Sequence, residues 1–408
     1  MLSAERIMQR CDALARHSEL PGGLTRVFLS PESRAAGELV LGWMREAGMQ
    51  ASLDAIGNAR GRYEGERPGL PCLMLGSHLD TVRDAGRYDG MLGVISAIEC
   101  VDFLNSQKRR LPFALEVVGF GDEEGVRFGT TLLGSRALAG TFNGEILNSV
   151  DANGITMEQA LRDFGLEPEK IPQVAKKKGE VLAYAELHIE QGPVLETEGL
   201  PVGVVTAING FSRHRVTLRG AAGHAGTVPM KLRRDALAGA AECALMVERV
   251  AKSDPELVGT VGRFEAKPGA INVIPGEVMF TVDVRAPDDR LREDAVSQIC
   301  AGIEQICHTR NLEARIESLQ HFPVTTCASS LIAQMERAVT SQGIRARRLP
   351  SGAGHDGMAL QALTDICMLF VRCKGGISHN PAEAISAQDA GAGARVLLHF
   401  ISHFEQGS

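Results

Sequence analysis

Four short segments of the sequence place acidic or imidazole side chains beside glycine, which is typical of sites that bind metal ions or move protons. They read GSHLDTV with a following YDG, then GDEEG, LHIEQG and GGISHNP. Carboxylate oxygen and imidazole nitrogen can share borderline divalent ions such as zinc. The candidate residues are His78, Asp80 and Asp89 in the first segment, Glu123 and Glu124 in the second, His188 in the third and His379 in the fourth.

Each segment alone also has a simpler explanation. Asp89 precedes a predicted helix and could cap it, while Glu123 and Glu124 could form a solvated acidic turn. His188 could be a structural strand residue, and His379 a loop residue. Adjacent carboxylates repel each other unless a cation or a proton intervenes. The case for metal binding therefore depends on whether the four segments meet.

The elements around these segments predict that they do meet. Apolar runs end before or within the segments, and helical patterns alternate with them, as in an α/β domain. In open α/β sheets, ligands gather beyond the carboxyl ends of the strands. We expect one crevice there, with Asp89 bridging two ions and Asp80 orienting the His78 imidazole. The runs cover residues 71–76, 113–119, 183–189 and 366–371, and the helical patterns cover 90–104 and 131–139.

A different pattern begins near residue 213 and ends near residue 322. It predicts the order strand, helix, strand, strand, helix, strand, which is the ferredoxin-like split motif. After this segment, the alternation of strand and helix patterns typical of an α/β domain returns, so the segment is predicted to be an inserted domain. The expected domains are a catalytic domain at 1–210 and 324–408 and an inserted domain at 211–323. The predicted elements of the insertion are 213–219, 234–251, 257–265, 277–285, 291–310 and 313–319.

Composition excludes several classes of protein. The 408 residues include 43 Lys and Arg against 50 Asp and Glu, a net charge of -7, with one Trp and three Tyr. Such a chain offers little basic or stacking surface for nucleic acid. It contains no run of about 20 apolar residues that would span a membrane. Nine cysteines without a CxxC pair predict reduced thiols and a cytoplasmic protein.

The motifs together resemble the hydantoinase/carbamoylase amidases, within the larger group of M20-type dinuclear metallopeptidases. The resemblance rests on SHLDTV, YDG, DEEG, LHIEQG, HAGTVPM, INVIPG, SGAGHD and GISHNPAE in this order. It implies a zinc-peptidase-like three-layer catalytic domain with an inserted lid and dimerisation domain. It also implies two divalent ions per subunit, the first held by His78, Asp89 and His188 and the second by Asp89, Glu124 and His379.

The same resemblance implies further roles. Glu123 becomes the general base, and His224, from the partner subunit, stabilises the oxyanion. Where peptidases of the larger group usually offer a carboxylate as a ligand, this chain has His188, which favours the carbamoylase branch. The implied substrate-binding residues are Gln191, Asn272, Arg285, Gly352 and Gly354, the last two through backbone N–H groups. From the alternating pattern alone, Arg285 would be only the polar face of a half-buried strand.

Together, these implications predict that the protein is a metal-dependent amidohydrolase that cleaves the carbamoyl group of an N-carbamoyl-L-amino acid. Allantoate is the second choice, because allantoate hydrolases tend to carry consecutive arginines where this chain has Ser212. β-Ureidopropionate, a dipeptidase or aminoacylase activity, and a noncatalytic metal-binding protein remain alternatives. Zinc is the first metal by ligand type, with manganese, cobalt or nickel as alternatives, and the resemblance implies a homodimer. His355 and Asp356 could be functional or could cap a helix.

Overall fold

The computed structural model describes residues 2–406, which form two compact units. Within this range, the first comprises residues 2–206, 326–349 and 353–406, and the second comprises Ala207–Thr325 and Pro350–Gly352. The second unit thus begins before residue 211, and it includes a short return segment that the sequence did not indicate. The reason is a main-chain hydrogen bond of 2.8 Å from the Asn209 N–H to the Ser351 carbonyl, which joins the two segments.

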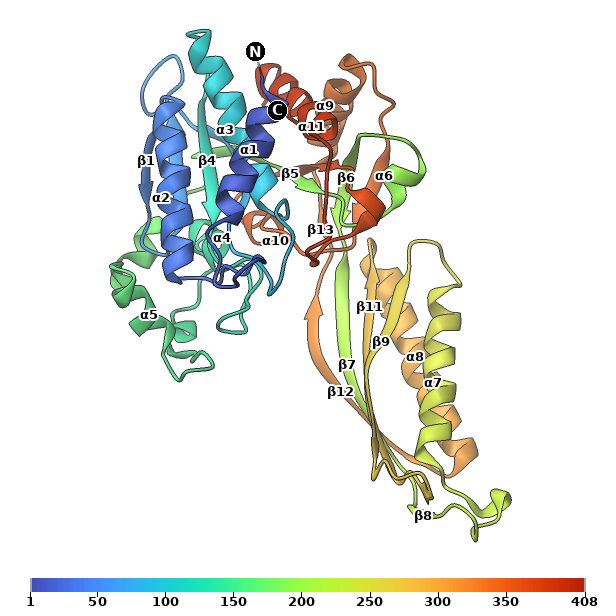
Figure 1. Cartoon of the computed structure of the whole chain (residues 1–408). Helices are drawn as coiled ribbons and strands as arrows, with labels where there is room; N and C mark the ends of the chain where they lie inside the picture. The colour runs from blue at the N-terminus through green and yellow to red at the C-terminus, as the bar shows by residue number, and fades with distance from the viewer. Residues whose placement is uncertain (1, 407–408) are drawn as a thin grey trace. The chain divides into compact units, whose positions relative to one another are not determined.

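Four parallel strands form the centre of the first unit (Figure 1). They are β4 (Ala114–Phe120), β3 (Cys72–His78), β5 (Val181–Ile189) and β15 (Ile366–Val371), in this spatial order. Every residue of β3, β4 and β15 is buried, as expected for parallel strands covered on both faces. Each strand lies within a few residues of its predicted run, so the carboxyl ends of all four meet at one edge of the sheet.

Antiparallel strands extend this sheet on both sides. The pair β2 and β1 continues it beyond β4, and β6 continues it beyond β15, where β13 and β14 pair with β6. These strands make the sheet mixed in direction. Their bounds are β1 (Gln50–Leu53), β2 (Ala59–Tyr63), β6 (Val202–Ile208), β13 (Thr325–Thr326) and β14 (Arg348–Ser351).

Helices cover both faces of the central strands, which gives the expected three layers. On β5, Leu187 packs against Gly93 of α3 and Gly393 of α11. The next residue, His188, points to the opposite face, where its ring contacts that of His355. The helices of this unit are α1 (Ala4–Ala15), α2 (Pro31–Glu46), α3 (Met91–Ser106), α4 (Leu133–Ala139), α5 (Met157–Asp163), α6 (Val194–Thr197), α9 (Ser329–Ser341), α10 (Gly357–Leu360) and α11 (Ala387–Ser402).

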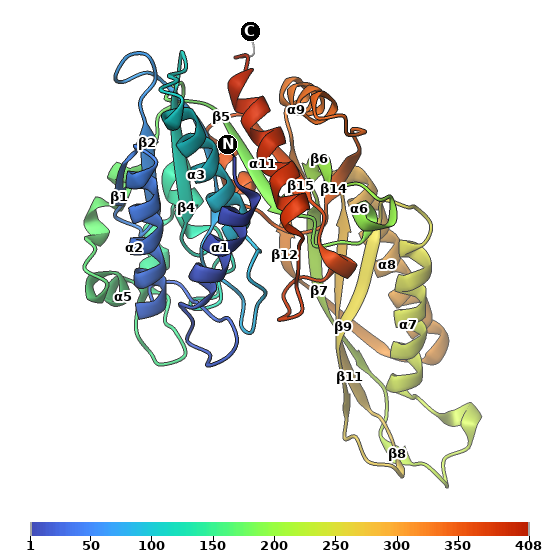
Figure 2. The ribbon, with the colours of Figure 1, turned by 45° about the horizontal axis from the view of Figure 1, so that its top comes forward.

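The second unit has the predicted βαββαβ order. Its antiparallel sheet runs β12-β7-β11-β9, and the two helices lie side by side on one face of that sheet (Figure 2). Alternate residues of β11 are buried against these helices, so its other residues face the open side. The elements are β7 (Gly210–Arg219), α7 (Ala236–Ala251), β9 (Val258–Lys267), β11 (Glu277–Ala286), α8 (Asp289–Arg310) and β12 (Glu313–Phe322).

A small two-stranded ribbon lies at one end of the second unit (Figure 1). It consists of β8 (Gly223–His224) and β10 (Val273–Ile274).

None of the nine cysteines forms a disulfide, and all except Cys300 are buried. Among the described residues, none of the helices combines the length and the apolar character needed to cross a membrane.

Candidate metal centre

The first unit brings the acidic and imidazole segments together at the carboxyl ends of its parallel strands. His78 is the last residue of β3, and His188 is the second-last residue of β5. Glu124 and His379 lie in the loops after β4 and β15. Within each of two groups, the potential ligand atoms lie within 4.8 Å of one another. These groups are His78, Asp89 and His188, and Asp89, Glu124 and His379. They coincide with the two predicted ligand sets.

Asp89 is shared between the two groups, and its two oxygen atoms face different partners. The Nε2 atoms of His78 and His188 lie 3.4 and 3.1 Å from Oδ1, whereas Nε2 of His379 lies 3.2 Å from Oδ2. His379 Nε2 also lies 3.4 Å from Glu124 Oε1. Asp89 does not cap the helix that follows it, because α3 begins without a side-chain cap. Its carboxylate is therefore free to bridge two cations.

Main-chain carbonyl groups set the orientation of two of the imidazoles. Nδ1 of His78 lies 3.0 Å from the Asp80 carbonyl oxygen, and Nδ1 of His188 lies 2.9 Å from that of Ile189. An Nδ1–H bonded to a carbonyl leaves the Nε2 lone pair directed at the site, which is the tautomer that a metal ligand needs. The donor set thus fits two divalent ions of the borderline type.

The electrostatics of the centre indicate a need for positive charge. Burial opposes the charge of Asp89, but hydrogen bonds from His188, His379 and His78 outweigh it and lower the pKa of this carboxyl well below its usual range. In turn, Asp89 and Glu124 raise the pKa of His379 to about 10. The carboxylates would therefore hold protons on the imidazoles whenever other cations are absent, and metal binding would displace those protons.

The two neighbouring glutamates differ in what they contact. Glu124 faces His379, whereas Glu123 is buried and approaches the group around His78. Burial and the negative charge of Glu124 raise the pKa of Glu123 well above its usual value, although His78 acts in the opposite direction. Glu123 also has a carboxylate oxygen within 4.8 Å of ligand atoms of His78 and Glu124, one residue from each set. A buried carboxyl with a raised pKa in this place is suited to proton transfer near neutral pH.

Asp80 contributes to the site in a different way from the one predicted. Its Oδ1 lies 3.7 Å from His78 Nδ1, and the imidazole is instead closest to the Asp80 main-chain carbonyl. The carboxylate accepts the backbone N–H groups of Glu123 and Glu124, at 3.0 and 3.1 Å. Asp80 therefore fixes the loop that carries both glutamates, next to Asp122, which adopts a left-handed φ of 61°.

Glu383 is a functional residue that the sequence reasoning did not assign. It is 4% exposed and accepts the backbone N–H groups of Tyr88 and Asp89 at 2.9 and 3.1 Å. The Ser378 hydroxyl lies 3.0 Å from both Glu383 and the Asp89 carboxylate. Glu383 thus holds the backbone of the shared aspartate. The signal was present in GISHNPAE, whose final residue is this glutamate.

Gln191 also contacts the shared aspartate. Its Nε2 donates to Asp89 Oδ2 at 3.0 Å and to the Ser378 hydroxyl at 3.1 Å. Its Oε1 is buried and has no hydrogen-bond partner among the described residues. A buried acceptor without a partner is costly, so this atom is placed to accept an N–H group from a bound molecule.

His355 and Asp356 lie on the inner side of the centre. Both are buried, and Asp356 precedes α10 without a side-chain cap hydrogen bond, so the capping explanation is wrong. The His355 ring stands edge-on to His188, with centroids 4.6 Å apart. Burial and the nearby His188 lower the pKa of His355 well below its usual value. A neutral imidazole in this place restrains the His188 ring through packing.

The remaining predicted residues divide between the two units. In the second unit, His224 and Asn272 are exposed on the ribbon, where the Ala225 N–H donates to the Asn272 carbonyl at 3.0 Å. Arg285 donates from Nη1 to the Gly352 carbonyl at 2.8 Å, so Gly352 offers its oxygen here where an N–H was predicted. In the first unit, Gly354 lies beside Glu123, because a Cβ added there would lie 3.6 Å from Glu123 Oε1.

Ser212 does not face the open side of the second sheet. It is buried on the helix-covered face of the second sheet, where its hydroxyl lies 3.2 Å from His321 Nδ1. The next residue, Arg213, points to the open face. Position 212 therefore does not line the open face, on which Arg213 and Arg285 stand.

A three-layer α/β unit with paired histidine and carboxylate groups at its strand ends is typical of metal-dependent hydrolases. A comparison with family models adds that residues 74–403 match peptidase family M20/M25/M40. The chain belongs to this family. Enzymes of the family use a pair of divalent metal ions, for which the two groups around Asp89 are the candidate sites.

Individual relatives narrow the comparison. The chain is 43% identical to an N-carbamoyl-L-amino acid amidohydrolase of Geobacillus stearothermophilus, with all of both chains covered. It is 42% identical to a probable allantoate deiminase of Oryza sativa, over 96% of this chain and 87% of the relative. A crystal structure of a hydantoinase/carbamoylase family amidase from Burkholderia multivorans has a TM-score of 0.93 at 33% identity, covering 98% and 97% of the two chains. The resemblance predicted from the motifs is confirmed.

Proposed function

We propose that this protein is a metal-dependent amidohydrolase that cleaves the carbamoyl C–N bond of an N-carbamoyl-L-amino acid. The products are the free amino acid, ammonia and carbon dioxide. The observation that carries the proposal is the shared Asp89, whose two oxygens serve two ligand groups while Glu123 stays outside both. The full-length match to an N-carbamoyl-L-amino acid amidohydrolase supports the choice of substrate.

His78, Asp89 and His188 would hold one ion, and Asp89, Glu124 and His379 the other. When bound, divalent ions supply Lewis acidity, lowering the pKa of water and polarising a carbonyl group. Zinc is the first choice, because three imidazoles and two carboxylates form the ligand set, and manganese, cobalt or nickel can use the same donors.

The chain's own groups move the proton and orient the substrate. Glu123 accepts a proton from the attacking water and returns it to the leaving nitrogen, for which its buried position and raised pKa are suited. Asp80 keeps the backbone of Glu123 in place. Gln191 Oε1, which is buried and without a partner, accepts an N–H of the ureido group. The backbone N–H groups of Gly352 and Gly354 remain proposed donors to the substrate.

Residues of the second unit would bind the substrate carboxylate and the developing oxyanion. Arg285 and Asn272 bind the carboxylate, and His224 of the partner subunit donates to the oxyanion. The exposed positions of His224 and Asn272 on the ribbon support a contribution to another subunit. Three large apolar side chains near them, Met230, Leu232 and Ile271, are also exposed, which supports a homodimer formed through this unit.

Allantoate is the second candidate substrate, ahead of β-ureidopropionate. Arg213 stands on the same open face as Arg285, with Nε 2.9 Å from Asp283, and allantoate deiminases are among the relatives. A dipeptidase or aminoacylase would use the same ligand set, and a noncatalytic protein would leave Glu123 without a role. Nine free cysteines support a reducing compartment such as the cytoplasm.

A substrate panel tests the proposed function. Ammonia release is measured with metal-reconstituted protein on N-carbamoyl-L-amino acids, allantoate, β-ureidopropionate, an N-acetyl amino acid and a dipeptide. We expect the highest kcat/KM on an N-carbamoyl-L-amino acid. Cleavage of only the acetyl or peptide substrate would overturn the proposal, and preference for allantoate would support the second candidate. Sedimentation that finds only monomers would rule out the role of His224 across an interface.

A further inference from the structure

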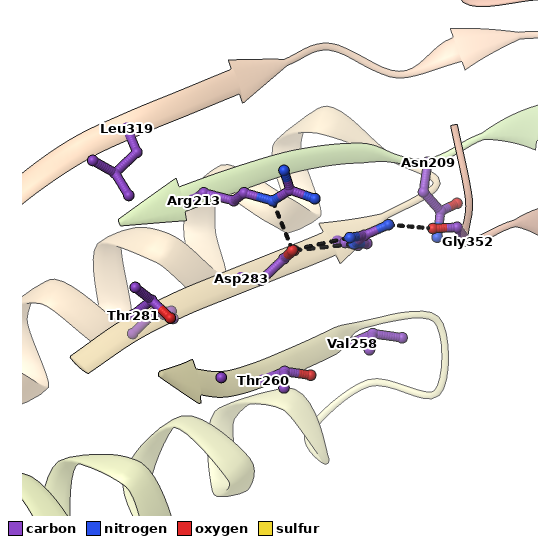
Figure 3. A pocket seen from close by; sticks show the side chains of 11 residues that line it. Asn209, Arg213, Val258, Thr260, Thr281, Asp283, Leu319 and Gly352 are labelled. Atoms are coloured by element: carbon purple, nitrogen blue, oxygen red, sulfur yellow. Dashed lines mark hydrogen bonds and ion pairs between the residues drawn. The ribbon is translucent and has the colours of Figure 1, made fainter. Parts of the chain in front are cut away.

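A pocket on the open face of the second unit contains an unusual arrangement of charges. It has a volume of 530 Å³ and is lined by residues of β7, β9, β11 and β12 together with Asn209 and Gly352 (Figure 3). Three of the residues that line it are charged, namely Arg213, Asp283 and Arg285. Two guanidinium groups and one carboxylate give the pocket a net charge of +1.

One carboxylate holds both guanidinium groups. Asp283 accepts Nε and Nη2 of Arg285 at 3.0 and 2.9 Å, and its Oδ2 also accepts Nε of Arg213 at 2.9 Å. Figure 3 shows the dashed line that joins Arg213 to Asp283. Burial opposes the charge of this carboxyl, but Arg285 and Arg213 outweigh it and lower its pKa. Asp283 is therefore ionised at neutral pH.

An aromatic ring and two neutral acceptor groups also hold the two guanidinium groups in place. The ring of Phe211 lies under both guanidinium groups, with its centroid 4.6 Å from the Arg213 Cζ and 5.5 Å from the Arg285 Cζ. Arg213 Nη1 donates to Gln320 at 2.7 Å, and Arg285 Nη1 to the Gly352 carbonyl. Arg285 has five N–H groups, of which three are engaged. One N–H remains on each Nη atom for a ligand.

We propose that Asp283 is a specificity-determining residue that makes this pocket accept ligands with one carboxylate and reject those with two. This inference rests on the proposed function, since it assigns the pocket to the acid group of the ureido substrate. One ligand carboxylate on Arg285 brings the net charge of the pocket to zero. A second carboxylate would make it negative and would face Asp283, and like charges in a partly buried site repel each other.

A matched pair of ligands tests the inference. N-carbamoyl-L-asparagine and N-carbamoyl-L-aspartate have nearly the same shape but differ by one negative charge. We expect the wild-type protein to favour the asparagine compound by at least about tenfold in kcat/KM. Asp283→Asn, which raises the charge of the pocket to +2, should reduce that preference by about tenfold. A preference that stays within about twofold of the wild-type value would overturn the inference.

Two further variants separate pocket charge from general effects. The double variant Arg213→Gln with Asp283→Asn returns the net charge to +1 and should restore most of the wild-type preference. Glu277→Gln is the matched control, because Glu277 lies on the same strand as Asp283 and pairs with Arg219 and Lys267 outside the pocket. It should leave the preference unchanged, and an equal shift in this control would overturn the inference.

A binding measurement makes the result independent of turnover. Both ligands are titrated by calorimetry into Glu123→Gln protein with Asp283 intact or replaced by Asn, with melting temperatures as the check on folding. If both ligands react or bind with an unaltered preference, the inference fails and the proposed function stands. If neither ligand reacts or binds, both fail.

Discussion

The metal centre combines histidine with carboxylate groups, and the pocket of the second unit combines arginine with a carboxylate, yet the two are built in opposite ways. In the metal centre, His78, Asp89 and His188 are at most 4% exposed, while the His379 side chain is 49% exposed, and the ligands come from segments spread over residues 78–379. The side chains of Arg213, Asp283 and Arg285 are 39%, 27% and 28% exposed, and they lie on two adjacent strands.

This difference follows from what each region has to do. Buried charges need several partners in fixed places, and Asp89 has three histidines, Ser378 and Gln191 within hydrogen-bond reach. Such a site is pre-organised for chemistry. Solvated charges on neighbouring strands are held less tightly and can adapt to a ligand. Changes in the first unit should therefore affect catalysis and metal binding, and changes in the second should affect substrate preference.

The largest expected effect comes from Glu123→Gln. Loss of the proton acceptor should lower kcat by a factor on the order of 10³, while metal content measured by atomic emission stays at the wild-type level. Glu124→Gln is the contrasting neighbour, because it removes a ligand and should reduce metal content. Loss of metal from the Glu123 variant, or near-normal turnover, would contradict the roles of both residues.

Glu383→Gln should have the next largest effect. It weakens the support of the Asp89 backbone, so metal affinity measured by chelator competition should fall about 10- to 100-fold. Glu190→Gln is a suitable control, because Glu190 is also buried beside a strand end but accepts the N–H groups of Val194 and Leu195 at the start of α6. An equal loss of affinity in this control would show that Glu383 acts only through general stability.

Arg285→Lys tests whether the second unit contributes recognition alone. A lysine cannot donate in parallel to a carboxylate, so KM should rise about tenfold, which corresponds to about 1.4 kcal/mol. Metal content should not change. The corresponding change at Arg219, which lies outside the pocket and pairs with Glu277, should leave KM as it is. A fall in metal content in the Arg285 variant would show that the second unit also affects metal binding and does not contribute recognition alone.

The smallest predicted effect concerns acid stability away from both sites. Burial raises the pKa of Glu116, but Arg60 and Lys176, at 2.6 and 2.7 Å, outweigh burial and lower it. A depressed folded-state pKa stabilises the protein above the ordinary value of 4.5, and this contribution is lost as the pH falls through the folded-state pKa. Glu116→Gln should therefore cost about 1 kcal/mol in urea unfolding at pH 7 and less at pH 3.5.

The exposed pair of Glu277 with Arg219 and Lys267 offers the comparison for this measurement. Glu277→Gln should give no resolvable change at either pH, because solvent screens exposed ion pairs. If Glu116→Gln lowers the free energy of unfolding by the same amount at pH 7 and pH 3.5, packing accounts for the lost stability and the ion pair does not.

Much of this arrangement was predictable from local patterns. Apolar runs that end in His78 or lead to Glu123 mark the strands, and the carboxyl ends of parallel strands must share an edge. The βαββαβ order followed from periodicity in the same way. The first two strands, Gln50–Leu53 and Ala59–Tyr63, were not predicted, because they are short and polar residues such as Arg60 and Arg62 interrupt them.

The direction of individual polar groups could not be predicted. Sequence spacing suggested that the Asp80 carboxylate would face His78, but it accepts backbone N–H groups 43 residues or more away. Ser212 and Arg213 are neighbours in the sequence and lie on opposite faces of one strand, which becomes informative only when the covered face is known. The motif GISHNPAE contains Glu383, but the support that this residue gives Asp89 spans 294 residues, so the motif alone could not show which backbone Glu383 holds.

The late strand β15 has a consequence for how the protein is made. It lies between β5 and β6, and His379 follows it, although the other three parallel strands and the other ligands come much earlier in the chain. Synthesis proceeds from the N-terminus, so a ribosome must complete the whole second unit before the gap in the first sheet is filled. A nascent or truncated chain ending before this strand therefore has no second ligand group, and catalytic competence arises in one final step of assembly.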